Sequence, residues 1–246
     1  SAAANRRPMI PALRHWLLRR RHPGRYAQLD ALLQNQALSR PALLEKQRRD
    51  FIGMARFATA HTAFYAQRDG DLTGWDGKPE SLPLLSKGDV RANLDRLLAR
   101  NADPTQVKLG HTGGSTGQPL AFWYDDAKHE LMRAGMCRGY MMSGWRPGQK
   151  ILNFWGARQD VVAGGVFGRQ LGAGLADFIA AERTIPAWEY SEANLHAWAS
   201  AIQAYRPTLL QGYASALTEV ARHVLARRMS MPKSLIGVYS TAEVLD

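Results

Sequence analysis

Short apolar segments alternate with longer helical segments over the C-terminal half of the chain, and this alternation restricts the fold more than any other feature. KILNFW at 150–155, TLLQGY at 208–213 and SLIGVYS at 234–240 have the length and composition of buried strands. Strands separated by helices of about 10 to 15 residues pair in parallel through right-handed crossovers. The sequence therefore predicts an α/β domain over 104–246, with a largely parallel sheet flanked by helices.

Capping residues and a proline predict where the helices of this region begin and end. Asp125 or Asp126 can accept hydrogen bonds from the first N–H groups of a helix that runs to about Met142. Ser191 can do the same for the next helix, and Pro207 ends that helix because proline has no N–H to donate. ASALTEVARHVLARR, which follows TLLQGY, has the spacing of a third helix.

Helical spacing dominates the N-terminal part of the chain. Apolar residues recur at intervals of three, four and seven over 41–66, which predicts one long helix with an apolar stripe. A stretch rich in Gly, Asp and Pro at 69–83 separates this helix from the rest. We expect residues 1–103 to form a helical N-terminal segment that packs on the main domain. The stripe consists of Leu44, Phe51, Ala55, Ala58, Thr62 and Tyr65.

The segment IPALRHWLLRRR at 10–21 combines a short apolar centre with arginines at 14, 19, 20 and 21. These arginines make it a poor signal peptide, and the sequence has no run of about 18 uncharged apolar residues that would span a bilayer. Two arrangements remain open for the segment. It is either a basic amphipathic helix on a membrane surface or a helix packed on the body with its arginines in water.

Basic residues exceed acidic ones by 32 to 21, which gives a formal net charge of +11. Such a field attracts polyanions, but it does not choose among a nucleotide, a nucleic acid and an acidic membrane surface. The alternative function is therefore a non-catalytic binding or scaffold protein that acts on an anionic surface or a nucleic acid. The sequence contains neither a basic helix interleaved with base-reading residues nor an aromatic RNA platform, so we expect no specific nucleic acid partner. The lone cysteine, Cys137, excludes a disulfide within the chain and a cysteine-cluster zinc site, and it is compatible with the cytoplasm.

A glycine-rich run, HTGGSTGQPL at 111–120, lies between two strand-like segments, VKLGHT and LAFWY. Glycine permits positive φ and close approach of the backbone to a ligand, and successive N–H groups in such a turn can bind an anion. The spacing matches neither the Walker pattern GxxxxGK[ST] nor GxGxxG. The residues alone leave two interpretations open: a loop that wraps a phosphate chain, or a β-hairpin connection in which Gly and Ser serve turn geometry.

TGGSTGQPL resembles the phosphate-binding loop of adenylate-forming enzymes, whose usual form is close to TSGTTGxPK. Leu120 stands where many members carry lysine, and Gly113 replaces the common serine. The leucine is familiar from one branch, the phenylacetate–CoA ligase-like proteins, which include relatives in capsular polysaccharide pathways. The residues that match the loop are Thr112, Gly113, Gly114, Ser115, Thr116, Gly117 and Pro119.

Further blocks of the same branch follow in order along the chain. QRRDFIGMARFATAHTAFYAQR resembles its N-terminal helix, and LPLLSKGDVRANLDRLL resembles the segment after that helix. GWRPGQKIL, RPTLLQGYASALTEVA and IGVYSTAEVLD correspond to later blocks. The resemblance covers nearly the whole chain from about residue 40, and it implies the large N-terminal domain of an adenylate-forming enzyme.

The resemblance implies a two-step reaction. A carboxylate attacks the α-phosphate of ATP to give an acyl-adenylate and pyrophosphate, and CoA or another nucleophile then takes the acyl group. Loop residues 112–117 would bind the β- and γ-phosphates, and Mg²⁺ would bridge phosphate oxygens, so no metal ligands are assigned to the protein. Thr241, Ala242 and Glu243 match the turn that lies against the nucleotide base, although Glu243 is equally well explained as an exposed carboxylate at a strand end.

Small and aromatic residues at the ends of two predicted strands are the candidates for an acyl pocket. Open α/β sheets bind ligands at the carboxyl ends of their strands, and aromatic walls with a small floor suit an aryl or short acyl chain. Core packing explains the same aromatics equally well. His111, beside the loop, is a candidate ligand contact or a structural histidine. The pocket candidates are Phe154, Trp155, Gly156, Gly212 and Tyr213.

The resemblance also implies parts that the sequence does not contain. The adenine-binding aromatic motif, the ribose-binding Asp, the hinge and the catalytic Lys of the family would all lie beyond Asp246, so the catalytic residues are unknown. We expect the chain to be part of a longer enzyme and to have no turnover by itself. The expected location is the cytoplasm, and peripheral membrane contact through the basic N-terminus stays open as the alternative to the packed helix.

Overall fold

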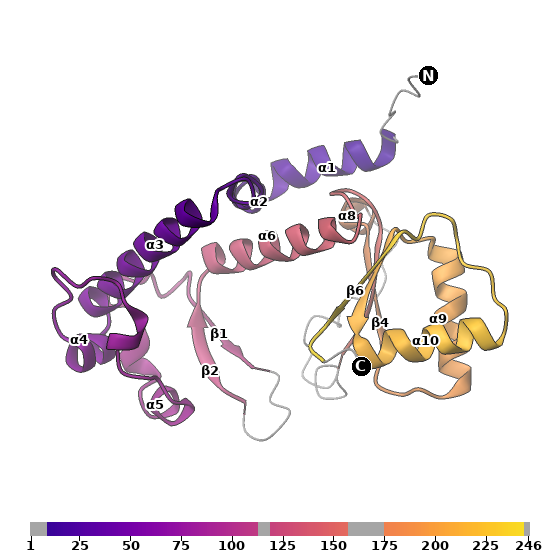
Figure 1. The fold of residues 1–246 in the computed structure, drawn as a ribbon. Coiled ribbons are helices and arrows are strands. Elements are labelled where there is room, and N and C mark those ends of the chain that lie inside the picture. Colours follow the sequence, from indigo (N-terminus) through magenta and orange to yellow (C-terminus); the bar gives the residue numbers. More distant parts are fainter. Residues whose placement is uncertain (1–8, 113–118, 157–174, 244–246) are drawn as a thin grey trace. The chain divides into compact units, whose positions relative to one another are not determined.

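The computed structural model describes residues 9–112, 119–156 and 175–243 (Figure 1). Two compact units make up the chain. The first, here called the sheet unit, combines Ser1–Leu29 with Ala134–Asp246, and the second, the hairpin unit, is Asp30–Arg133. We expected a boundary near residue 103, whereas the compact units divide the chain at 29–30 and 133–134.

The described part of the sheet unit contains four parallel strands in the order β4-β3-β5-β6. Its fold is thus the predicted α/β class with a parallel sheet, and β3, β5 and β6 correspond to the predicted strands. The sequence analysis missed β4, because its first two residues, Glu182 and Arg183, are charged and it lies at the edge of the sheet. The strands are β3 (Ile151–Trp155), β4 (Glu182–Pro186), β5 (Leu209–Tyr213) and β6 (Gly237–Thr241).

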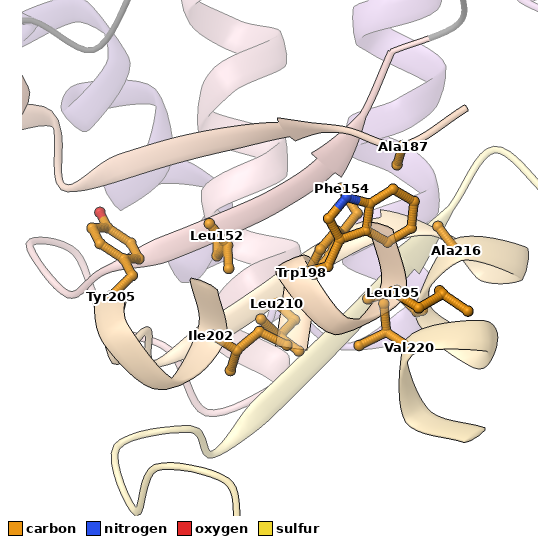
Figure 2. Packing of buried hydrophobic residues seen from close by; sticks show 11 residues of the cluster. Leu152, Phe154, Ala187, Leu195, Trp198, Ile202, Tyr205, Leu210, Ala216 and Val220 are labelled. Carbon is orange, nitrogen blue, oxygen red and sulfur yellow. The ribbon is translucent and has the colours of Figure 1, made fainter. Parts of the chain in front are cut away.

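Two helices, α9 (Glu192–Tyr205) and α10 (Ala214–Ala226), pack on one face of this sheet (Figure 1). Alternate strand residues point toward them, as Figure 2 shows for Phe154 and Leu210. The ring centroid of Phe154 lies 5.7 Å from that of Trp198 on α9. Full burial of a side chain of this size contributes about 1.5–3 kcal/mol, so this cluster holds the helices to the sheet. It consists of Leu152, Phe154, Ala187, Leu195, Trp198, Ile202, Tyr205, Leu210, Ala216, Leu217 and Val220.

Helix α6 (Asp126–Met142) reaches the opposite face of the sheet with its C-terminal turns. The Tyr140 hydroxyl donates a hydrogen bond to Oε1 of Gln211 on β5, and both side chains are buried. The Tyr140 ring also meets the ring of Tyr239 on β6 edge to face, with centroids 5.2 Å apart. Gly139 permits this approach, because a Cβ there would lie 3.0 Å from the Tyr239 ring. Helices therefore cover both faces of the sheet.

The predicted helix caps are confirmed for two of these helices. Asp125 Oδ1 accepts a hydrogen bond from the N–H of Lys128 at 2.7 Å and starts α6. Ser191 Oγ accepts from the N–H of Asn194 at 3.3 Å and starts α9. Each cap depends on a few consecutive residues, which is why the local sequence is enough to find it.

Helix α1 (Met9–Arg21) packs against α8 (Leu175–Ala180) and is followed by α2 (Pro23–Asn35). The guanidinium carbon of Arg14 lies 4.3 Å from the centroid of the Phe178 ring, and Arg14 is only 7% exposed. Helix α1 is thus packed on the sheet unit, as one of the two open arrangements predicts. That arrangement had all the arginines in water, whereas Arg14 is buried. None of the described helices is long and apolar enough to cross a membrane.

In the hairpin unit, α3 (Arg40–His61) and α4 (Ala63–Asp69) replace the single helix expected over 41–66. The expectation is wrong at Thr62, whose backbone is extended at φ −114° and ψ 138°. The Thr62 hydroxyl oxygen accepts a hydrogen bond from the N–H of Tyr65 at 3.3 Å and donates one to the Ala58 carbonyl at 2.9 Å. One side chain thus ends the first helix and caps the second.

The rest of the hairpin unit consists of short elements that lead into a β-hairpin. These elements are η1 (Pro79–Ser81), α5 (Lys87–Ala92) and η2 (Asp95–Leu97). The strands β1 (Lys108–His111) and β2 (Ala121–Tyr124) then pair antiparallel. The hairpin is attached to the segment before it, because Trp123 Nε1 donates a hydrogen bond to the Leu94 carbonyl at 3.2 Å.

Candidate functional site

Thr112 and Leu120 close the neck of the glycine loop. The N–H of Thr112 donates to the Leu120 carbonyl at 2.9 Å, and the N–H of Leu120 donates to Thr112 Oγ1 at 3.0 Å. The second bond depends on the Thr112 hydroxyl, so this side chain sets where the two strands meet the loop. The other predicted phosphate ligands, Gly113 to Gly117, lie outside the described residues.

The loop joins two antiparallel strands, which is the topology that the hairpin interpretation predicts. This topology also suits a phosphate loop, because a hairpin end presents consecutive N–H groups that an anion can contact. Binding of phosphate by this loop therefore stays a prediction. Beside the hairpin, Lys128 Nζ lies 5.3 Å and 5.4 Å from the ring centroids of Phe122 and Tyr124. His111 is exposed at the end of β1.

At the carboxyl ends of β3 and β5, the rings of Trp155 and Tyr213 stack, with centroids 4.6 Å apart and an interplanar angle of 14°. Both side chains are half-buried. Trp155 points to the sheet face opposite to Phe154, because successive strand residues point to opposite faces, whereas Tyr213, at the end of β5, also packs against the cluster that contains Phe154. The stacked pair therefore brings two aromatic rings to the edge where open α/β sheets bind ligands.

Phe154 and Gly212, two other pocket candidates, have clear structural roles. Phe154 has no exposed surface and lies in the core beneath α9. Gly212 pairs with Phe154 across the strands, and a Cβ on Gly212 would lie 2.7 Å from the Phe154 carbonyl oxygen. These two residues therefore shape the sheet below the Trp155–Tyr213 stack. Gly156 is buried with φ 110°, in the region that favours glycine.

Glu243 lies just beyond β6, at the amino end of α10. Its Oε2 accepts a hydrogen bond from the N–H of Ser215 at 2.8 Å. The Ser215 hydroxyl lies 3.0 Å from the Tyr190 hydroxyl, so three side chains meet at this helix end. Of the base-contact candidates, Thr241 is half-buried, whereas Ala242 (φ 68°) and Glu243 are exposed. Sequence reasoning missed Ser215 and Tyr190, because only the folded chain brings them to Glu243.

The chain is similar in sequence to a known protein and in fold to a solved ligase structure. No protein-family model matches the chain. Protein CapK from Staphylococcus aureus is 23% identical over 215 residues, which cover 82% of this chain and 45% of CapK. A crystal structure of 2-hydroxyisobutyryl-CoA ligase, in complex with 2-HIB-AMP and CoA in the thioesterification state, aligns with 75% of this chain and 40% of the ligase, at a TM-score of 0.50 and 15% identity.

The chain has part of the fold of an adenylate-forming ligase. This confirms the fold that the resemblance implies. The chain spans less than half the length of CapK and less than half that of the ligase.

At the amino ends of β3 and β4, away from the predicted acyl pocket, a group of cations surrounds Tyr205. Lys150 Nζ donates a hydrogen bond to the Tyr205 carbonyl at 3.0 Å, and the Arg183 guanidinium carbon lies 4.4 Å from the Tyr205 ring centroid. The pKa of Lys150 lies below its ordinary value. Burial is the main cause, and repulsion from Arg14, Arg183 and Arg206 adds to it. Burial raises the pKa of Tyr205 to about 12, and the charges of Arg183 and Arg14 act against this rise.

The described parts of the chain offer no ready metal site. Within residues 9–112, 119–156 and 175–243, no three His, Cys, Asp or Glu side chains come together as metal ligands would. An open depression in the hairpin unit, lined by Arg56, Thr59, Leu72 and Thr73 among others, contains none of the predicted site residues.

Proposed function

We propose that this chain is part of an AMP-forming acid–thiol ligase. The enzyme would activate a carboxylic acid with ATP and transfer the acyl group to CoA or another nucleophile. The main support is the combination of this fold with the hydrogen bond that the Leu120 N–H donates to Thr112 Oγ1 at the neck of the glycine loop. Thr112 is the first residue of the matching motif. The similarity to CapK and the ordered sequence blocks add to it.

In the first step a carboxylate oxygen bonds to the α-phosphorus of ATP, and the bond from that phosphorus to the β-phosphate bridging oxygen breaks. Pyrophosphate leaves with the bonding electron pair. The N–H groups and hydroxyls of residues 112–117 would bind the β- and γ-phosphates, where negative charge grows as pyrophosphate departs. Mg²⁺ that arrives with ATP would supply positive charge and so lower the repulsion among the phosphates.

The nucleotide base would lie against Thr241, Ala242 and Glu243, which match the base-contacting turn of the family that the sequence resembles. Glu243 already holds the amino end of α10 through Ser215. Its position is therefore fixed by the fold before any ligand arrives, which supports a role in orienting the nucleotide.

The acyl group would lie on the surface made by Trp155 and Tyr213. A stacked pair of half-buried rings suits an aryl or short acyl chain, which gains from leaving water. Phe154 and Gly212 support these rings from within the sheet. We place the reaction in the cytoplasm, where ATP and CoA are supplied, and its product in polysaccharide synthesis, in line with the branch that the sequence resembles.

Two measurements test the proposal. Isothermal titration calorimetry of the 246-residue chain with Mg·ATP should give weak binding that Gly117→Val abolishes, because a side chain there blocks the approach of phosphate to the backbone. Gly135→Val is the matched control, since a Cβ at Gly135 on α6 meets nothing within 4 Å. The longest polypeptide that carries this chain should catalyse ATP–pyrophosphate exchange with at least one of a panel of aryl, short-chain and amino acids. No ATP binding together with no exchange across the panel would reject the proposal.

A further inference from the structure

Helix α1 presents apolar side chains to the outside. Met9, Ile10, Leu13 and Trp16 are exposed by 87%, 53%, 51% and 50%. Residues 9, 13 and 16 follow the spacing of one helix side, and Ile10 lies next to them. Single exposed apolar residues are normal on protein surfaces, but four on one side of a 13-residue helix form a patch.

The orientation of α1 is fixed by its other side. Arg14 is buried over the Phe178 ring of α8, with 4.3 Å between the guanidinium carbon and the ring centroid. Gly148 comes so close to α1 that a Cβ there would lie 2.1 Å from the Pro11 carbonyl oxygen. Hydrophobic burial alone would place Leu13 and Trp16 inside and Arg14 outside, but in α1 the reverse holds. The exposed patch therefore fits a helix that has a second contact.

Basic residues flank the patch. The last turn of α1 consists of Arg19, Arg20 and Arg21. The Arg20 guanidinium carbon lies 4.1 Å from the centroid of the Trp16 ring, so one arginine continues the side that carries the apolar residues. Tryptophan and arginine together are typical of helices that lie at the boundary between lipid headgroups and acyl chains.

We propose that α1 binds an anionic phospholipid surface, with Met9, Ile10, Leu13 and Trp16 in the outer acyl region and Arg19 to Arg21 on the lipid phosphates. The helix would lie in the plane of the membrane, because 13 residues span only about 20 Å against about 30 Å of hydrocarbon. A second copy of the chain is a poorer occupant, because it would bring its own three arginines to the same contact. A nucleic acid would leave the apolar patch uncovered. The inference is independent of the proposed ligase reaction.

Vesicle flotation tests the proposal. The chain should float with vesicles of equal parts phosphatidylcholine and phosphatidylglycerol, and much less with phosphatidylcholine alone. Leu13→Gln combined with Trp16→Gln should weaken binding by about tenfold or more, because two side chains no longer leave water. Leu225→Gln is the matched control, since Leu225 is 76% exposed on α10. Circular dichroism melting must show that each variant is folded.

The charge contribution has its own variant pair. Replacing Arg19, Arg20 and Arg21 by Gln should weaken binding to the anionic vesicles by about a hundredfold, and high salt should do the same to the wild type. Replacing Arg222, Arg227 and Arg228 by Gln removes equal charge from the end of α10 and should have a much smaller effect.

Three outcomes would overturn the proposal. They are equal binding to charged and uncharged vesicles, unchanged binding by the Leu13/Trp16 variant, and a Trp16-dependent dimer in analytical ultracentrifugation without vesicle binding. Loss of binding in the longest polypeptide that carries this chain would count equally, because it would show that another segment covers α1.

Discussion

Oε2 of Glu243 accepts a hydrogen bond from the backbone N–H of Ser215, with 2.8 Å between the two atoms. Ser215 belongs to the first turn of α10, whose N-cap residue, Tyr213, makes no side-chain capping bond. A carboxylate brought from the end of β6 therefore does the work that a local cap does elsewhere. The interaction also places negative charge at the positive end of the helix dipole.

Glu243→Ala should accordingly lower the free energy of unfolding by about 1 kcal/mol, and Glu243→Gln by about half as much, since the amide oxygen still accepts the bond. Urea unfolding at low and high salt measures both, and salt should reduce the difference between them. If Glu243 also orients the nucleotide, both variants should weaken ATP binding under conditions where each is fully folded. Equal stability of Ala and wild type would contradict the capping role.

The Trp155–Tyr213 stack makes a separate prediction about the acid substrate. Trp155→Ala should raise the KM for the acid in pyrophosphate exchange by about tenfold, because one of the two stacked rings is lost. Tyr213→Phe keeps the ring and should change KM by less than about twofold. An unchanged KM in Trp155→Ala, with the variant shown to be folded, would place the acyl group elsewhere.

Gly212 and Gly135 form a matched pair for stability. Gly212→Ala should lower the free energy of unfolding by about 1–3 kcal/mol, because the added Cβ meets the Phe154 carbonyl oxygen at 2.7 Å. Gly135→Ala, within α6 and with nothing within 4 Å, should raise it by about 0.5–1 kcal/mol. Urea unfolding of both variants checks the signs, and a neutral Gly212→Ala would show that β3 and β5 can separate without loss.

Tyr205 predicts a loss of stability at high pH. Burial raises its pKa to about 12 in the folded state, so the unfolded chain ionises first as the pH passes about 10. The contribution is fully present below about pH 10 and is lost between about pH 10 and 12. The lowered pKa of Lys150 acts with the opposite sign, so the comparison must be with Tyr205→Phe, which keeps Lys150 and the backbone carbonyl it contacts. The wild type should lose stability relative to Tyr205→Phe across this window in urea unfolding, and a difference that does not vary with pH would contradict it.

The hydroxyl of Thr112 should matter at the neck of the glycine loop. Thr112→Val keeps the shape but loses the acceptor for the Leu120 N–H, so it should weaken Mg·ATP binding. Thr112→Ser keeps the hydroxyl and should bind nearly as the wild type does. Calorimetry on both variants makes the comparison, and equal affinity of the Val and Ser variants for Mg·ATP would show that the hydroxyl does not contribute to binding.

Local sequence was sufficient wherever a few neighbouring residues decide the structure. The caps at Asp125 and Ser191 and the strands β3 and β5 are of this kind. It failed at Thr62, because the apolar spacing continues through a residue whose hydroxyl ends one helix and starts another. It also failed at β4, where edge position lets a strand carry Glu182 and Arg183.

The candidate site divides in the same way. The glycine loop and the strand ends have local signatures, so the sequence could name Thr112, Trp155 and Tyr213. The bond between Glu243 and Ser215 joins residues 28 positions apart, and no local pattern reports it. The sequence also could not say which side of α1 faces outward, because it shows an amphipathic helix without its partner.

The sheet unit is assembled from two separate stretches, and this has a consequence for synthesis on the ribosome. The hairpin unit, Asp30–Arg133, is continuous in sequence, so all of its residues are synthesised before the sheet unit is complete. Helix α1 must wait for Phe178 and Gly148, which are translated more than a hundred residues later. Until then both of its sides are open, and a nascent chain in this condition is a natural client for a chaperone.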